Sequence, residues 1–80
     1  MVKDKKYEIA KNRILARFKT SNIICAMRMK DGFLFSIKPK NTKDYVLDAF
    51  FKVDNNGNIT DYSPVMNPEE FKEAMNNIIT

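Results

Sequence analysis

The side chains on which most hydrolytic and metal-dependent enzymes rely are missing from this chain of 80 residues. It contains no histidine and only one cysteine, Cys25. It can therefore form neither an internal disulfide bond nor a catalytic pair of cysteine and histidine, and it lacks the ligands of a zinc cluster. We expect a protein that is not an enzyme and needs no cofactor.

Long apolar runs are also missing. No segment approaches the roughly 20 apolar residues that cross a bilayer, and no apolar stretch follows the N-terminal lysines as in a signal peptide. The chain is 44% hydrophobic and 30% charged, as in an ordinary folded domain. Eighty residues have room for one core. We expect residues 1–80 to form one cytoplasmic domain with no membrane segment.

A metal loop is suggested by composition but not by spacing. Residues 54–58 read Asp-Asn-Asn-Gly-Asn, which resembles the start of a calcium loop. The bidentate glutamate needed at the twelfth position is absent, because Val65 stands there. The segment is predicted to be a turn, and no metal site is expected.

Two hairpins are predicted from alternating apolar residues. In the first, residues 23–29 and 33–37 are strands joined by a three-residue loop, Lys30–Gly32. This loop would place all paired apolar side chains on one buried face: Met29 with Phe33, Met27 with Phe35 and Cys25 with Ile37.

The second hairpin begins with a strand over residues 45–53 and turns near Asn56 and Gly57. A two-residue turn pairs Val53 with Thr60 and Phe51 with Tyr62, and this register is preferred. A three-residue loop pairs Val53 with Ile59 and Phe51 with Asp61, and it remains the alternative.

An amphipathic helix is expected at each end of the chain. Residues 5–19 carry apolar side chains at helical spacing after Asp4, which is a suitable N-cap. Near the C-terminus, Asn67 is predicted to cap a helix that starts at Pro68, with Glu70 completing a capping box.

The predicted fold is α+β, with the order helix, four-stranded antiparallel meander, helix. Both helices are expected to pack on one face of the sheet. The opposite face would then expose Ile24, Leu34 and Phe50. A face this apolar indicates a homodimer contact or a surface for another protein.

Charge is divided unevenly along the chain. Residues 1–40 carry a net charge of +8, and residues 41–80 carry −4. Part of this excess forms a basic stripe along the first helix, and part lies in the polar loop after the second strand. The basic candidates for partner binding are Lys6, Arg13, Arg17, Lys38, Lys40 and Lys43.

Two functional classes follow from these surfaces. The first is a protein-protein interaction module that uses the edge of the first helix or the open sheet face. The alternative is a nucleic-acid-binding module that uses the first helix and the loop over residues 38–43.

One family resemblance accompanies these predictions. Residues 45–79, including Phe-Phe-Lys-Val-Asp-Asn-Asn-Gly-Asn-Ile-Thr-Asp-Tyr-Ser-Pro at 50–64 and Asn-Pro-Glu-Glu-Phe at 67–71, resemble small proteins of phages and prophages of Gram-positive bacteria. The resemblance implies no catalytic residues and no particular activity. It is in keeping with a small regulator or inhibitor of another protein.

Overall fold

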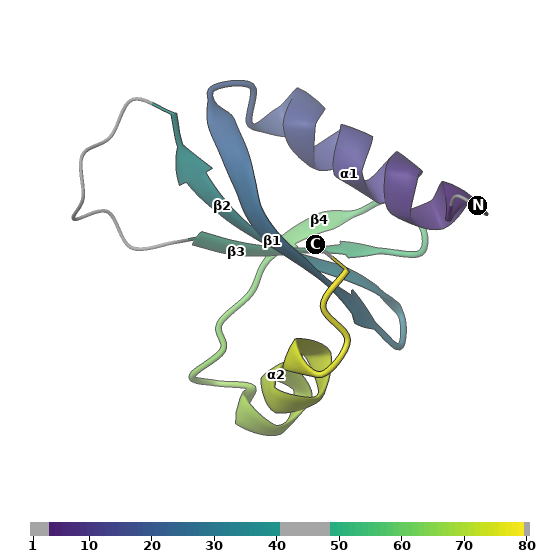
Figure 1. The fold of residues 1–80 in the computed structure, drawn as a ribbon, viewed down its shortest axis with the longest axis vertical. Coiled ribbons are helices and arrows are strands. Elements are labelled where there is room, and N and C mark those ends of the chain that lie inside the picture. Colours follow the sequence, from purple (N-terminus) through teal and green to yellow (C-terminus); the bar gives the residue numbers. More distant parts are fainter. Residues whose placement is uncertain (1–3, 41–48, 80) are drawn as a thin grey trace.

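The computed structural model of the chain describes residues 4–40 and 49–79. Four strands form one antiparallel sheet in the order β1-β2-β3-β4, with a helix before them and a helix after them (Figure 1). The predicted α+β fold is confirmed. The elements are α1 (Lys5–Arg17), β1 (Ser21–Met29), β2 (Gly32–Pro39), β3 (Ala49–Asp54), β4 (Ile59–Asp61) and α2 (Pro68–Met75). The first part of the predicted strand over residues 45–53 lies outside the described residues.

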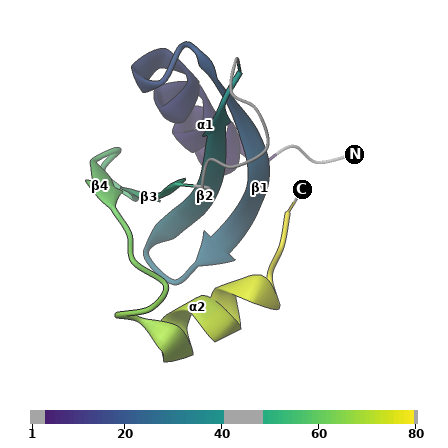
Figure 2. The ribbon, with the colours of Figure 1, turned by 90° about the vertical axis from the view of Figure 1, so that its left-hand side faces the viewer.

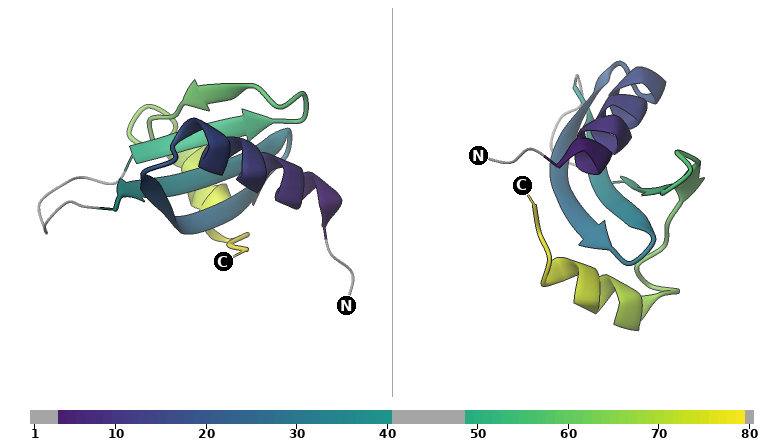
Figure 3. Two further views of the ribbon diagram at one scale, coloured as in Figure 1. Left: turned by 90° about the horizontal axis from the view of Figure 1, so that it is seen from above. Right: turned by 90° about the vertical axis from the view of Figure 1, so that its right-hand side faces the viewer.

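The two helices lie on opposite faces of the sheet, so the expectation that both cover one face is wrong (Figures 2 and 3). Each helix has its own buried cluster. The α1-face cluster consists of Ala10, Ile14, Ala26, Phe33, Phe35, Ile37 and Val53, with Tyr7, Phe18, Ile23, Phe51, Ile59 and Ile79 packed around it. The α2-face cluster consists of Met27, Leu34 and Ala74, with Cys25, Met29, Phe50, Tyr62 and Phe71 around it.

Strand β2 explains why both faces need a cover. Every residue from Gly32 to Ile37 is buried. Successive side chains of a strand point to opposite faces, so Phe35 packs under α1 while Leu34, with 0% of its surface exposed, packs under α2. A sheet that is apolar on both sides buries more surface between two helices than beneath one.

The turn between β1 and β2 is shorter than predicted, and the predicted pairing of these strands is wrong. Only Lys30 and Asp31 lie between the paired ends of the strands. Methionines of β1 therefore face α2, while the phenylalanines of β2 face α1. Both faces can bury apolar side chains, so hydrophobicity alone does not select the register. The observed partners are Met29 with Gly32, Arg28 with Phe33, Met27 with Leu34, Ala26 with Phe35 and Cys25 with Ser36.

The hairpin of β3 and β4 adopts the alternative register. Val53 pairs with Ile59 and Phe51 with Asp61, so the preferred two-residue turn is wrong. The carboxylate of Asp54 accepts hydrogen bonds from the backbone N–H groups of Asn56 and Asn58, each at 2.9 Å. Gly57 has a φ of +85°, a conformation that glycine adopts without strain. These local bonds favour the three-residue loop.

Both predicted N-cap positions are confirmed, but only the first cap forms side-chain capping bonds. Asp4 accepts hydrogen bonds from the backbone N–H groups of Lys6 at 3.1 Å and Tyr7 at 3.2 Å. Asn67 stands at the N-cap position of α2, but its side chain makes no capping bond and donates to the carbonyl of Ser63 at 2.9 Å. Asn67 therefore stabilises the turn before α2 and leaves the capping box incomplete.

Candidate functional site

The apolar residues predicted to bind a partner do not form an open face. Leu34 is fully buried beneath α2, and the ring of Phe50 packs edge-on against Phe71, with centroids 5.3 Å apart. Ile24 is exposed, but it lies at a β-bulge on the outer strand β1. The predicted contact surface of Ile24, Leu34 and Phe50 is therefore wrong, because α2 already covers most of it.

The basic residues of α1 are exposed along one side of the helix. Lys6, Arg13 and Arg17 all lie on the surface. The side chain of Arg13 lies close over Gly57, because a Cβ atom placed on that glycine would lie 2.5 Å from the Arg13 Nε atom. Lys6 lines a small cavity of about 70 Å³ that also includes Asp54. The side of α1 toward the β3–β4 turn thus combines cations with an acidic neighbour.

A second group of cations gathers where α1 ends. The backbone N–H of Lys40 donates to the carbonyl of Thr20 at 2.8 Å, and Asn22 pairs with Lys38. These contacts bring Lys38 and Lys40 to the same end of the molecule as the last turn of α1. We call Arg17, Lys19, Lys38 and Lys40 the basic end. Sequence reasoning missed Lys19, and Lys43 lies outside the described residues.

A largely apolar hollow lies where β3 and β4 stop pairing. Its volume is about 680 Å³. Phe50 and Phe51 come from neighbouring positions of β3, and the backbone N–H of Tyr62 donates to the carbonyl of Phe50 at 3.0 Å. We call this site the edge hollow. It is lined by Ala49, Phe50, Phe51, Asp61, Tyr62, Ser63, Pro64 and Val65.

The edge hollow is lined on one side by an apolar side chain that lies in water. Val65 of the lining is 88% exposed, and Met66, the next residue in the chain, is 82% exposed. Asp61 is the one charged residue of the lining. Of these residues the sequence reasoning singled out only Phe50. The sequence could have indicated Val65 and Met66, because they are adjacent apolar residues between Pro64 and Pro68 and belong to no periodic helix or strand.

Tyr62 joins the edge hollow to the α2-face cluster. Its hydroxyl oxygen is buried and forms no hydrogen bond with the described residues. Burial and the Glu70 carboxylate raise the pKa of Tyr62 to about 12, because both disfavour the phenolate. The phenol therefore stays protonated well into the alkaline range, and its hydroxyl can donate a hydrogen bond to a partner or accept one.

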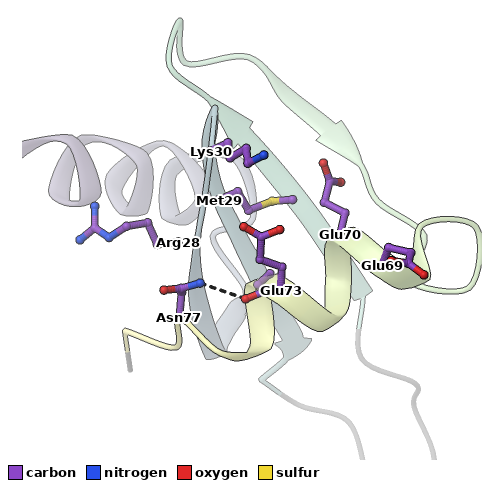
Figure 4. Close-up of a pocket in the computed structure, with 8 residues that line it drawn as sticks. Arg28, Met29, Lys30, Glu69, Glu70, Glu73 and Asn77 are labelled. Carbon is purple, nitrogen blue, oxygen red and sulfur yellow. Dashed lines mark hydrogen bonds between the residues drawn. The ribbon is translucent and has the colours of Figure 1, made fainter.

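A second cleft, of about 490 Å³, separates α2 from the end of β1 (Figure 4). Glu69, Glu70 and Glu73 form its outer wall, and Arg28 extends away from them. The guanidinium of Arg28 binds the carboxylate of Asp4 at 2.6 Å, which holds the pKa of Asp4 below its ordinary value. The glutamates at the start of α2 complement the positive end of the helix dipole.

In residues 4–40 and 49–79, no three cysteine, aspartate or glutamate side chains gather as metal ligands, and no helix could span a membrane. Cys25 is half-buried beside the α2-face cluster, where it acts as a small apolar side chain.

Comparison with known protein families, with curated proteins and with solved structures finds no match to this chain.

Proposed function

We propose that the chain is a non-enzymatic protein-protein interaction module that binds its partner at the edge hollow. The observation that carries this proposal is the pair of exposed residues Val65 and Met66 beside an aromatic-lined hollow of about 680 Å³. Single exposed apolar residues are common, but two adjacent ones that follow the lining of an apolar hollow support a binding site there.

The hollow defines the chemistry of the partner. Burying one side chain of the size of Val65 or Met66 contributes about 1.5–3 kcal/mol. A partner that inserts an apolar side chain into the edge hollow gains a similar amount. Asp61 at the wall favours a partner with a basic residue beside that apolar anchor. We further propose a cytoplasmic regulator or inhibitor of another protein, in keeping with the resemblance to phage proteins.

The proposal is tested by selecting displayed peptides against the folded domain. Selected peptides are expected to carry an aromatic or aliphatic anchor next to lysine or arginine. In ¹⁵N-labelled protein, they should shift the amide signals of residues 49–51 and 61–66. The double variant Val65→Ser/Met66→Ser should weaken binding at least about tenfold, because two anchors are lost.

The matched control changes an exposed apolar residue elsewhere. Ile9 is exposed on α1, and Ile9→Ser should leave peptide affinity unchanged. Peptides that bind equally well to both variants, or that shift only signals of α1, would contradict the edge hollow as the binding site.

Nucleic-acid binding is the second candidate, and one observation favours it. The hydrogen bond between Lys40 and Thr20 and the pairing of Asn22 with Lys38 gather four cations at the basic end. Binding there should weaken with salt by roughly 0.9 log units per log unit of salt for each duplex phosphate contacted.

Fluorescence anisotropy with random duplex and single-stranded oligonucleotides measures this slope. The variant Arg17→Glu/Lys40→Glu should abolish binding, while the control Lys72→Glu on α2 should have little effect. Absence of salt-dependent binding by the unaltered protein excludes this second candidate.

A further inference from the structure

The C-terminal residues 77–79 form a strap across the outer edge of β1. The backbone N–H of Arg28 donates to the carbonyl of Asn77 at 2.9 Å, and the N–H of Ile79 donates to the carbonyl of Ala26 at 2.7 Å. Met27 and Ile78 form the antiparallel bridge between these bonds. The chain therefore leaves α2 on one face, passes the edge of β1 and ends near α1 (Figure 2).

The strap links the two faces of the sheet through few contacts. Ile79 packs against the α1-face cluster, while Ala74 belongs to the α2-face cluster. Between them, Ile78 is more than half exposed. Among the described residues, two backbone hydrogen bonds hold the strap on β1. A pairing this short holds an edge strand only weakly.

We propose that the edge of β1 beneath the strap is a strand-addition surface, and that β1 of a second copy is the partner that competes with the strap for it. This proposal rests on the strap contacts and does not depend on the edge hollow.

A second copy fits this edge because β1 is self-complementary. Ala26 and Arg28 are the residues that bond the strap, so their polar backbone groups face outward. A two-fold axis at Met27 places Ala26 of each copy opposite Arg28 of the other. Such a pair exchanges both of its N–H···O bonds, so the dimer forms four bonds, as many as the two displaced straps made together.

Charge and shape also permit this pairing. Arg28 is the one charged residue of β1, and the axis at Met27 does not place the two arginines directly opposite each other. The β-bulge between Ile23 and Cys25 interrupts the other half of the edge. Bulges of this kind protect sheet edges from pairing, so the site available to a second copy is the half that the strap covers.

The test uses one variant in two redox states. Met27→Cys/Ile78→Cys in a Cys25→Ser background places two thiols at a bridge whose Cα separation of about 4.5 Å suits a disulfide. The protein is oxidised at low concentration, and the monomer with the disulfide inside one chain is isolated, because the two-fold axis at Met27 would otherwise allow a disulfide between copies. Sedimentation velocity over a range of concentrations compares this oxidised form, in which the strap is locked, with the reduced form. We expect the oxidised form to remain monomeric and the reduced form to form dimers.

A second pair of variants tests the same surface without a disulfide. Ile79→Pro removes the N–H that bonds Ala26, and it should increase the dimer association constant by about fivefold or more, the effect of one lost backbone hydrogen bond on the free strap. The control Ile78→Ser keeps both backbone bonds and should associate like the unaltered protein. Circular dichroism establishes that each variant is folded.

Equal association of the oxidised and reduced forms overturns the proposal. So does a folded Ile79→Pro variant that associates no more than the unaltered protein. Peptide binding at the edge hollow is measured separately, so failure here leaves the proposed function standing, and the reverse also holds.

Discussion

Replacing Tyr62 by phenylalanine removes one buried oxygen from the edge hollow and keeps the ring. The hydroxyl of Tyr62 is buried without a hydrogen bond to the described residues. A buried polar group in that state costs about 1–3 kcal/mol of folding free energy. Tyr62→Phe should therefore raise the free energy of unfolding near neutral pH by about 1 kcal/mol.

The same change should alter the response to alkali. The pKa of Tyr62 is raised to about 12 in the folded protein, whereas a tyrosine in an unfolded chain titrates near pH 10. Between these values the unfolded chain has lost the proton that the folded chain keeps, so the free energy of unfolding falls as pH rises. The loss approaches about 1.4 kcal/mol per pH unit, or about 2–3 kcal/mol at most.

Urea denaturation followed by circular dichroism measures both effects. The difference between the variant and the unaltered protein should grow between about pH 10 and pH 12. The pKa of Tyr7 is also raised by burial, but Tyr7 is present in both proteins and cancels in the difference. Glu70→Gln is the matched control, because it keeps the hydroxyl and removes the charge that helps to raise its pKa.

One result would refute this reasoning. If Tyr62→Phe is less stable than the unaltered protein by more than about 1 kcal/mol at neutral pH, the hydroxyl makes a favourable hydrogen bond in solution. The carboxylate of Glu70 would be its acceptor.

Two further predictions concern the core and the first helix cap. Phe35→Ala should lower the free energy of unfolding by about 3–5 kcal/mol in urea denaturation, because its fully buried ring leaves a cavity beneath α1; a loss below about 1 kcal/mol would contradict its burial. Asp4→Asn should lower the melting temperature at neutral pH, because the depressed pKa of Asp4 signals a stabilising carboxylate. That stabilisation is present above the ordinary pKa and is lost as pH falls through the depressed one, so the difference in melting temperature should begin to shrink near pH 4 and vanish only below the depressed pKa.

Local chemistry predicted much of the fold. The position of Asp4 before a run of helical periodicity gave the cap of α1, and the two turn segments located both hairpins. These features depend on neighbouring residues, which the sequence shows directly.

Features that depend on distant residues were harder to predict. The run from Phe33 to Ile37 is almost continuously apolar, which is typical of a strand buried on both faces. Treating it as a half-buried strand put both helices on one side. The strap over residues 77–79 has no periodic pattern of its own. Its pairing is with Ala26 and Arg28 of β1, which are distant in the sequence.

The candidate site was also predictable only in part, because it too combines local features with contacts between distant residues. Phe50 was predicted to meet a partner, and it does line the edge hollow, but its other contacts lie beneath α2. Pro64, Val65 and Met66 were missed because they belong to a turn, where amphipathic periodicity gives no signal. The pairing of β1 with β2 brings Lys38 and Lys40 to the end of α1. This pairing could not be predicted correctly from the sequence.

The central claim is that α2 closes the second face of the sheet and leaves the edge hollow as the open apolar surface. Urea denaturation of Leu34→Ala and Val65→Ala tests it most directly. Leu34→Ala should lose about 2–5 kcal/mol because the side chain is fully buried, and Val65→Ala should change stability by less than about 0.5 kcal/mol because the side chain lies in water. A folded Leu34→Ala variant of unchanged stability, or a large loss in Val65→Ala, would contradict the account.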